Sequence, residues 1–150
     1  MSVPVESIKK SLNRMIDSLE ETEPRRIVVK AAPEHLKTIF RRLLKDFKDD
    51  FYLDFLATVD YVEEGQIEAS YNVWIYSLKT VLTVKLRLPR DNPTIATISD
   101  LIPSAVYHEQ EAYDLMGVTF SGNQSLKRGF LVAEEAQDSF PLRKEEARKA

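Results

Sequence analysis

The chain has 150 residues, a net charge of −3, no cysteine and two histidines. This length suits one domain, and 43% hydrophobic residues is typical of a folded protein, which excludes general disorder. The slight negative charge disfavours binding to nucleic-acid backbones, and the lack of cysteine excludes disulfides, thiol nucleophiles and cysteine-ligated Fe–S or zinc sites.

The first third of the sequence predicts a helix, a strand and a second helix. Apolar residues recur at helical spacing over residues 5–20, which predicts an amphipathic helix. The β-branched run at 27–29 predicts a first strand. Pro33 and a second apolar stripe, with basic residues on its other face, predict a helix over residues 33–47.

The middle of the chain predicts an antiparallel meander over residues 52–88, because apolar residues alternate along three successive runs. The proline-rich stretch 89–93 ends this sheet. A third helix is expected over residues 104–116, with Gly117 at the position of a left-handed C-terminal cap. The run at 118–120 is too short to assign by itself.

These elements predict an α+β fold of two layers, a mostly antiparallel sheet with helices on one face, formed by residues 1–120. Residues 121–150 are polar with isolated apolar side chains, which predicts an extended C-terminal tail that wraps a partner subunit. No apolar run reaches the length of a membrane span, and the N-terminus lacks the layout of a signal peptide. We therefore expect a chain in the cytoplasm that reaches a membrane complex only through a partner.

The densest polar cluster lies within the third predicted helix. Glu111 and Asp114 are three residues apart and share one helix face, and Glu109 and Tyr113, four apart, share another. Such carboxylates could serve acid–base catalysis, or form half of a metal site together with His108. The metal site needs a matching motif on another helix, and the sequence contains none. We favour a charged helix face that forms ion pairs with a partner or with the chain's own basic residues.

Residues 105–122 read AVYHEQEAYDLMGVTFSG and resemble the signature WxERExYDLFGIxFxG of the 30 kDa subunit, also called the C subunit, of respiratory complex I. Residues 141–145, PLRKE, resemble the later PxRKD element of that family. Tyr107 stands in place of Trp, Gln110 in place of Arg, and residues 123–128, NQSLKR, in place of HPDLRR. These departures favour the subunit's relatives in group 4 membrane-bound nickel–iron hydrogenases and related sulfur-reducing complexes, with the C subunit of a NADH/quinone-type complex I as the alternative.

The resemblance implies a non-catalytic, cofactor-free structural subunit in the cytoplasmic arm of a membrane-bound, ion-translocating oxidoreductase complex. Its implied partners are a large subunit of the 49 kDa or hydrogenase-large type, a small Fe–S subunit and, through them, antiporter-like membrane subunits. Fe–S clusters, and a nickel–iron site in a hydrogenase, would lie in those partners. The family motifs place the contacts with the large subunit at Glu109, Glu111, Tyr113, Asp114, Gly117, Leu126, Arg128, Pro141, Leu142, Arg143 and Lys144.

Two alternatives from other functional classes remain at this point. A stand-alone enzyme would use His108, Glu109 or Glu111 and would need a pocket around that helix. A small adaptor unrelated to respiration would bind a different partner and would not need the tail.

Overall fold

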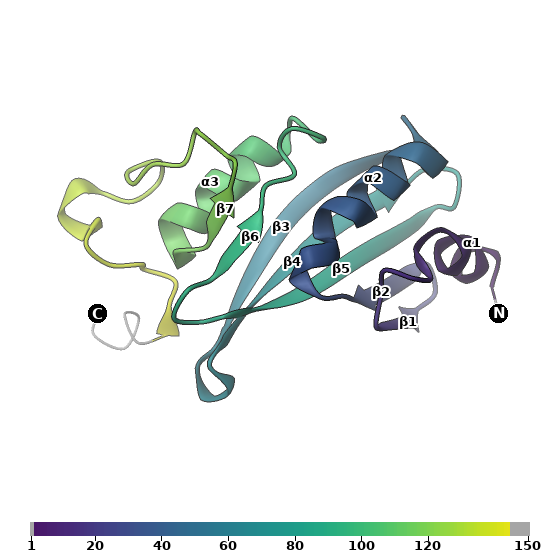
Figure 1. Ribbon diagram of the computed structural model, residues 1–150, viewed down its shortest axis with the longest axis horizontal. Coiled ribbons are helices and arrows are strands. Elements are labelled where there is room, and N and C mark those ends of the chain that lie inside the picture. The colour runs from purple at the N-terminus through teal and green to yellow at the C-terminus, as the bar shows by residue number, and fades with distance from the viewer. Residues whose placement is uncertain (1, 145–150) are drawn as a thin grey trace.

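The computed structural model describes residues 2–144. Figure 1 shows its helices and strands in their spatial arrangement. In chain order they are α1 (Val3–Leu12), β1 (Ser18–Glu23), β2 (Arg26–Lys30), η1 (Pro33–His35), α2 (Leu36–Phe47), β3 (Phe51–Tyr61), η2 (Val62–Glu64), β4 (Gln66–Ile75), β5 (Thr80–Pro89), β6 (Thr94–Ala96), α3 (Ala105–Met116), β7 (Thr119–Ser121) and η3 (Glu134–Ala136).

Five strands form one mixed sheet in the order β1-β2-β5-β4-β3. The pairs β1–β2, β5–β4 and β4–β3 are antiparallel, and β2–β5 is parallel. The predicted meander is confirmed as β3, β4 and β5, and the predicted α+β class is confirmed with it. The short strands β6 and β7 pair in parallel as a separate sheet, which gives the unassigned run at 118–120 its structure.

The predicted first helix over residues 5–20 is wrong in its second half. Helix α1 ends at Leu12, and β1 begins at Ser18. Ser18 and Leu19 pair with Lys30 and Val29 of β2, so a pairing across the chain overrides the local helical spacing. The apolar residues that continued the helical pattern instead pack against the core from the turn and from β1.

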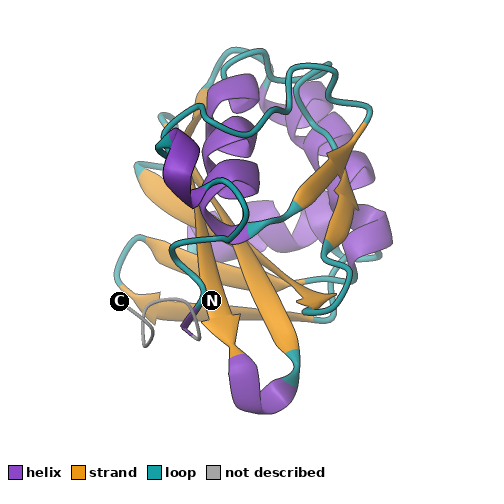
Figure 2. Ribbon diagram, turned by 90° about the vertical axis from the view of Figure 1, so that its left-hand side faces the viewer, coloured by secondary structure: helices purple, strands orange, loops and turns teal. Residues whose placement is uncertain are grey.

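Helices cover one face of the large sheet, as the end view in Figure 2 shows. The alternate residues of β4 and β5 on this face are fully or almost fully buried. Phe40 of α2 meets Tyr71 of β4 edge to face, with ring centroids 5.6 Å apart. Ala105, Ala112 and Met116 of α3 belong to the same core. The core therefore lies between the sheet and its helices, as the predicted two-layer arrangement requires.

The other face of the sheet carries polar and aromatic side chains in place of a second layer of helices. On β5 the polar members are Thr83, Lys85 and Arg87, which alternate with the buried leucines and valines. The strand β3 forms one edge of the sheet, and a register shift between Leu53 and Phe55 marks a bulge in it. This edge and α3 lie next to one another and form the region described next.

Candidate partner interface

Helix α3 ends at Met116 and is capped by Gly117, which has a left-handed backbone (φ +81°) and whose N–H bonds the carbonyl of Tyr113 at 3.0 Å. A Cβ at this position would lie 2.8 Å from Cε2 of Phe140 in the tail. Glycine is therefore required here twice, once for the turn and once for the close approach of the tail. The predicted cap at Gly117 is confirmed, and the residue is buried inside the chain.

Asp114 is fully buried and organises the segment that follows β7. Its carboxylate accepts hydrogen bonds from the N–H groups of Gly129 (2.9 Å), Leu131 (2.7 Å) and Val132 (2.8 Å), and from Nε of Arg128 (3.0 Å). Burial alone raises the pKa of a carboxyl, but these donors outweigh it and hold the pKa of Asp114 below its ordinary value. The charged form of Asp114 thus fixes the course of the tail.

Arg128 connects this carboxylate to the next stretch of the tail. Its guanidinium donates to the carbonyl of Ser139 and lies 4.3 Å from the centre of the Phe140 ring. Arg143 approaches the same ring at 5.1 Å and donates from Nε to the carbonyl of Met116 at 2.8 Å. Asp114, from the motif, and Arg128, from the tail, were both predicted as site residues. The structure brings them together, and the contact between them lies within this chain.

The end of the described tail runs back along α3 toward β3. The N–H of Leu142 bonds the carbonyl of Leu115 at 3.0 Å, while its side chain is 53% exposed. The N–H of Lys144 bonds Oδ2 of Asp60 at 3.0 Å. Pro141 is half-buried and the Lys144 side chain is exposed. Residues 141–144 therefore lie on this chain's own surface and keep apolar and charged side chains open to solvent.

Glu109 is fully buried, with neutral partners where the sequence predicted Lys or Arg. Thr97 Oγ1 lies 2.6 Å from its Oε1, the N–H of Ile98 donates to the same oxygen at 3.0 Å, and Asn123 Nδ2 lies 3.3 Å from Oε2. Burial raises the pKa of Glu109 above its ordinary value, against the effect of these donors. The carboxyl ties α3 to the segment after β6 and does not reach the surface.

The remaining predicted residues of α3 lie closer to solvent. Glu111 is exposed and forms no ion pair with any residue between 2 and 144. Tyr113 and Leu126 are half-buried, and Leu126 packs against the core. The carboxylates of α3 therefore do not converge, because Glu109 and Asp114 are each enclosed by different partners. In the described part of the chain, no three His, Asp or Glu side chains are grouped so as to hold a metal ion.

Three exposed residues near this region were not among the site residues predicted from the sequence. Tyr107 of α3 is 67% exposed and lies one turn before Glu111, so the helix presents an aromatic ring and a carboxylate on one stripe. The exposed apolar side chains Phe55 and Val59 project from β3. The motif position of Tyr107 was a usable signal, because large aromatic residues are favoured at the centres of interfaces.

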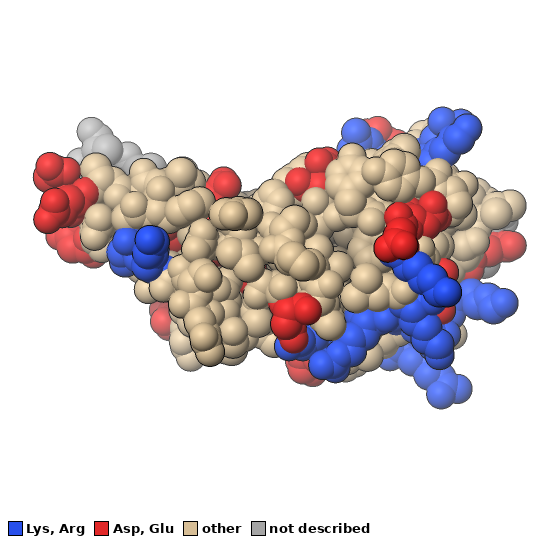
Figure 3. Space-filling view, turned by 90° about the horizontal axis from the view of Figure 1, so that it is seen from above, with Lys and Arg blue, Asp and Glu red and all other residues tan. Residues whose placement is uncertain are grey.

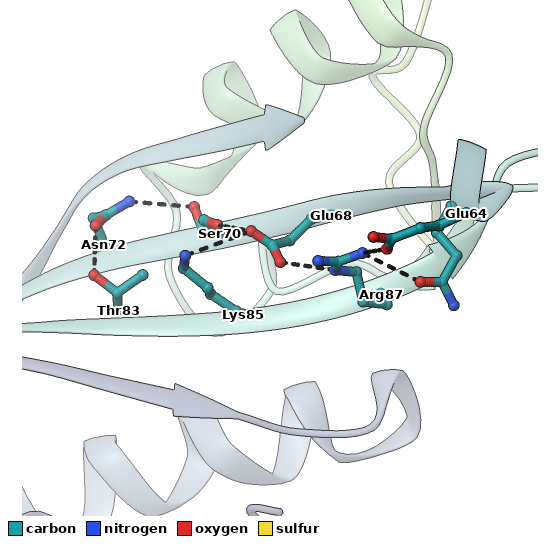
Figure 4. A network of polar contacts seen from close by, with 8 residues as sticks. Glu64, Glu68, Ser70, Asn72, Thr83, Lys85 and Arg87 are labelled. Atoms are coloured by element: carbon teal, nitrogen blue, oxygen red, sulfur yellow. Dashed lines mark hydrogen bonds and ion pairs between the residues drawn. The ribbon is translucent and has the colours of Figure 1, made fainter. Parts of the chain in front are cut away.

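The uncovered face of the sheet holds a polar network, shown in Figure 4. Arg87 of β5 donates to Glu64 and, at 2.8 Å, to Oε2 of Glu68 on β4, and it stacks over the Tyr61 ring at 3.8 Å. Lys85 reaches Oε1 of the same Glu68 at 3.6 Å. All of these hydrogen bonds and ion pairs join residues of the same chain. The alternation of Lys85 and Arg87 was visible in the sequence, but their pairing with Glu68 depends on strand register.

A second buried ion pair joins the sheet to the loop after β5. Arg90 contacts Asp60 through Nε–Oδ1 at 2.7 Å and Nη2–Oδ2 at 3.0 Å, and the Asp60 side chain is 1% exposed. The hydrogen bond from Arg90 lowers the pKa of Asp60 below its ordinary value, against the opposing effect of burial. Because Asp60 also accepts the Lys144 N–H, this pair anchors the last described residues of the tail.

Charged side chains are not spread evenly over the surface. Figure 3 shows basic side chains gathered at the end of the molecule that carries α1 and α2. On α2, Lys37 pairs with Asp100 at 2.8 Å, and Arg42 pairs with Asp46 at 3.0 Å. No helix among the described residues has the length and apolar character needed to cross a bilayer.

Comparison with known proteins places this fold and motif in a family. The sequence profile of the respiratory-chain NADH dehydrogenase 30 kDa subunit matches residues 29–150. The C subunit of NADH-quinone oxidoreductase from Moorella thermoacetica is 31% identical over 134 residues, which cover 89% of each chain. The C subunit of F420H2 dehydrogenase from Methanosarcina mazei is 33% identical over 90 residues, 60% of this chain and 56% of its own.

A chain in the structure of the membrane-bound sulfane sulfur reductase, an archaeal respiratory membrane complex, has the same fold. The TM-score is 0.85 with 23% identity, over 96% of this chain and 85% of that one. The resemblance inferred from residues 105–122 and 141–145 is confirmed by the family profile, which spans both motifs. The chain belongs to the family of the 30 kDa subunit of respiratory-chain NADH dehydrogenase.

Proposed function

We propose that this chain is a structural subunit of a membrane-bound oxidoreductase complex, without catalytic residues or a cofactor of its own. The observation that carries the proposal is the family match over residues 29–150, together with relatives named as subunits of NADH-quinone oxidoreductase and F420H2 dehydrogenase. With no cysteine and two histidines, the 150 residues offer few ligands for a redox centre. Electron transfer then belongs to Fe–S clusters in neighbouring subunits.

The large subunit of the complex is the proposed direct partner, with the small Fe–S subunit and antiporter-like membrane subunits reached through it. The surface proposed for this contact comprises the exposed stripe of α3 and the exposed side chains of the tail, and we call it the α3–tail surface. Its exposed members are Tyr107, Glu111, Leu142 and Lys144. The proposal also includes Tyr113 and Leu126, which are half-buried. Glu109, Asp114, Gly117, Arg128, Pro141 and Arg143 have a supporting role in the proposal, since they hold α3 and the tail in shape.

In this proposal the buried residues of the motif order the tail, and its exposed residues contact the partner. The buried layer, with its charge-assisted hydrogen bonds, pre-organises the tail before a partner arrives, which lowers the ordering cost of binding. The exposed layer supplies an aromatic ring, aliphatic side chains and charges, and charges of this kind set register and specificity more than affinity. The complex would hold the chain at the cytoplasmic side of the membrane as a peripheral subunit.

Two classes of complex are supported by different observations. The fold likeness to the sulfane sulfur reductase chain covers 96% of this chain and favours a sulfur-reducing complex, the relative of the membrane-bound hydrogenases that the motif departures indicate. The 31% identity to the C subunit of a NADH-quinone oxidoreductase, over 89% of both chains, supports a quinone-type complex. The partner's sequence separates the two, because a hydrogenase large subunit retains four nickel-binding cysteines.

The test is purification of the tagged chain from detergent-solubilised source membranes, followed by mass spectrometry of the proteins that accompany it. We expect a hydrogenase-like large subunit, a small Fe–S subunit and antiporter-like membrane chains in fixed proportion. The cysteines of the recovered large subunit then identify the class of complex. Recovery of the chain alone would overturn the proposal and return attention to an enzymatic role for the α3 carboxylates.

A further inference from the structure

The outer edge of β3 is protected at its start by the bulge between Leu53 and Phe55, but the stretch after the bulge has little protection of its own. Strand β4 pairs with one side of β3 along its length, and no strand in residues 2–144 pairs with the other. Between Asp54 and Asp60 the strand reads FLATV, without charge, proline or glycine. Natural sheets normally guard a free edge with such residues or cover it, since its open N–H and C=O groups recruit other strands. We therefore expect another protein chain to cover this edge in the assembled complex.

A groove of about 380 Å³ runs along this edge, between β3 and α3. Successive side chains of a strand point to opposite faces, so four consecutive residues can line one groove only if it follows the strand's edge. The helix contributes positions spaced three, four and seven apart, which form one helix face. The lining residues are Phe55, Leu56, Ala57, Thr58, His108, Glu111, Ala112, Leu115 and Leu142.

The chemistry of the groove specifies its occupant. Leu56, Ala112 and Leu115 make its walls apolar, and Phe55 and Leu142 stand 46% and 53% exposed at its rim. Glu111 supplies an exposed carboxylate with no ion partner among the described residues. An extended peptide with apolar side chains on one face would satisfy the open backbone groups of β3, and a Lys or Arg would pair with Glu111.

We propose that an extended segment of the partner subunit occupies this groove, adds a strand to the free edge of β3 and places a Lys or Arg against Glu111. The inference rests on the proposed function for the existence of that partner and adds the mode of contact. The groove is continuous with the α3–tail surface through Glu111 and Leu142.

A second copy of this chain is a poor occupant. Strand β3 contains Asp54 and Asp60 and neither Lys nor Arg, so pairing two β3 edges would bring only acidic side chains toward Glu111. Asp60 is already bound by Arg90. Charge complementarity therefore favours a different chain with a basic residue in its strand.

The first test measures access to the groove in the purified complex. The sequence has no cysteine, so Glu111→Cys and the control Glu6→Cys each provide one thiol. Glu6 is an exposed residue of α1, which lies at the other end of the molecule from α3 (Figure 1). Glu111 is exposed among residues 2–144, so labelling that is slower in the complex than in the isolated variant reports shielding by a partner. We expect maleimide to modify position 111 at least tenfold more slowly than position 6 within the complex. Equal rates would overturn the inference.

The second test asks whether the occupant is a strand. In a free edge strand alternate amides point to solvent and exchange fast, whereas a strand paired on both sides protects every amide. Hydrogen-exchange mass spectrometry of the intact complex is expected to show slow exchange at all amides of residues 55–59. Fast exchange at alternate amides, with the complex intact, would overturn strand addition and leave the proposed function standing. Failure of the unmodified tagged chain to recover any partner would overturn both.

Discussion

Asp114 of α3 and Arg128 of the tail form an ion pair, with Nε 3.0 Å from Oδ1, in which the carboxylate is completely buried. Three backbone N–H groups of the tail bond the same carboxylate. One side chain in the family motif thus decides the path of a segment that begins fourteen residues later. Further along the tail, the backbone N–H groups of Leu142 and Lys144 bond Leu115 and Asp60, which places both residues, with exposed side chains, beside α3 and β3.

Replacing Asp114 with Asn is expected to loosen the tail and destabilise the fold. The substitution leaves Arg128 without its counter-charge and removes an acceptor from the buried N–H groups, a type of change that costs about 3 kcal/mol. Urea unfolding followed by circular dichroism measures the loss, and limited trypsin digestion at Lys127 and Arg128 reports the local opening. Asp138→Asn, at a position of the same tail outside this network, is the matched control and is expected to change neither.

The Asp60–Arg90 pair is expected to make stability depend on acid pH. The folded-state pKa of Asp60 lies below its ordinary value of 3.8, so its stabilising effect is full above pH 3.8 and is lost as pH falls through the folded pKa. Asp60→Asn should therefore cost about 3 kcal/mol at pH 7, and the difference from the unsubstituted chain should shrink below pH 3.8. Asp54→Asn on the same strand, where the side chain is exposed, serves as the control. A pH-independent difference would contradict the assignment.

Glu109 is expected to make the unfolding free energy depend on pH in the opposite direction to Asp60. Its folded-state pKa lies above the ordinary value of 4.5, so the folded chain holds this proton more tightly than the unfolded chain does. The resulting stabilisation is full below pH 4.5 and is lost as pH rises through the folded pKa. The unfolding free energy of the chain, minus that of Glu109→Gln, should therefore increase as pH falls toward 4.5. A difference that decreases over this range would show that the carboxyl prefers its charged form.

Gly117→Ala is expected to destabilise the chain more than Gly65→Ala does. Both glycines have positive φ, at +81° and +64°, so both substitutions carry backbone strain. A Cβ at Gly65 meets nothing within 4 Å, whereas one at Gly117 overlaps Phe140. The extra loss, about 1–2 kcal/mol, measures the packing of the tail on the end of α3. Combining Gly117→Ala with Phe140→Ala in a double-mutant cycle should remove the part of this extra loss that comes from Phe140, while the Nη2 atom of Arg143, 2.9 Å from the same Cβ, stays in place. A purely additive result would show that Phe140 does not cause the extra loss.

Glu111→Ala is expected to weaken assembly while leaving the chain folded. The carboxylate is exposed and makes no ion pair within residues 2–144, so its removal costs the isolated fold little. Less large subunit should accompany the tagged variant from solubilised membranes, with its circular dichroism spectrum unchanged. Glu6→Ala, at an exposed position on α1, should recover the full amount. Equal recovery for the two variants would remove Glu111 from the interface.

Features determined by neighbours along the chain were readable from the sequence. Alternation along β5 and helical spacing along α2 follow from the geometry of strands and helices, so both elements fall where the pattern predicts. Gly117 was recognisable as a cap because only its own backbone and helix are involved. The family motif at residues 105–122 was also a local signal, which is why it identified the family before any fold was known.

Contacts between segments that are far apart in the sequence were decided only by the tertiary structure. The second half of the predicted first helix became β1 because Leu19 pairs with Val29, and no local propensity reports that pairing. Lys144 meets Asp60 across 84 residues of sequence. Glu109 and Glu111 look equivalent in the sequence, yet one is enclosed by Thr97 and Ile98 and the other faces solvent. Helical periodicity separates their faces, but only the docking of α3 determines which face is buried, and therefore which carboxylate remains open to a partner.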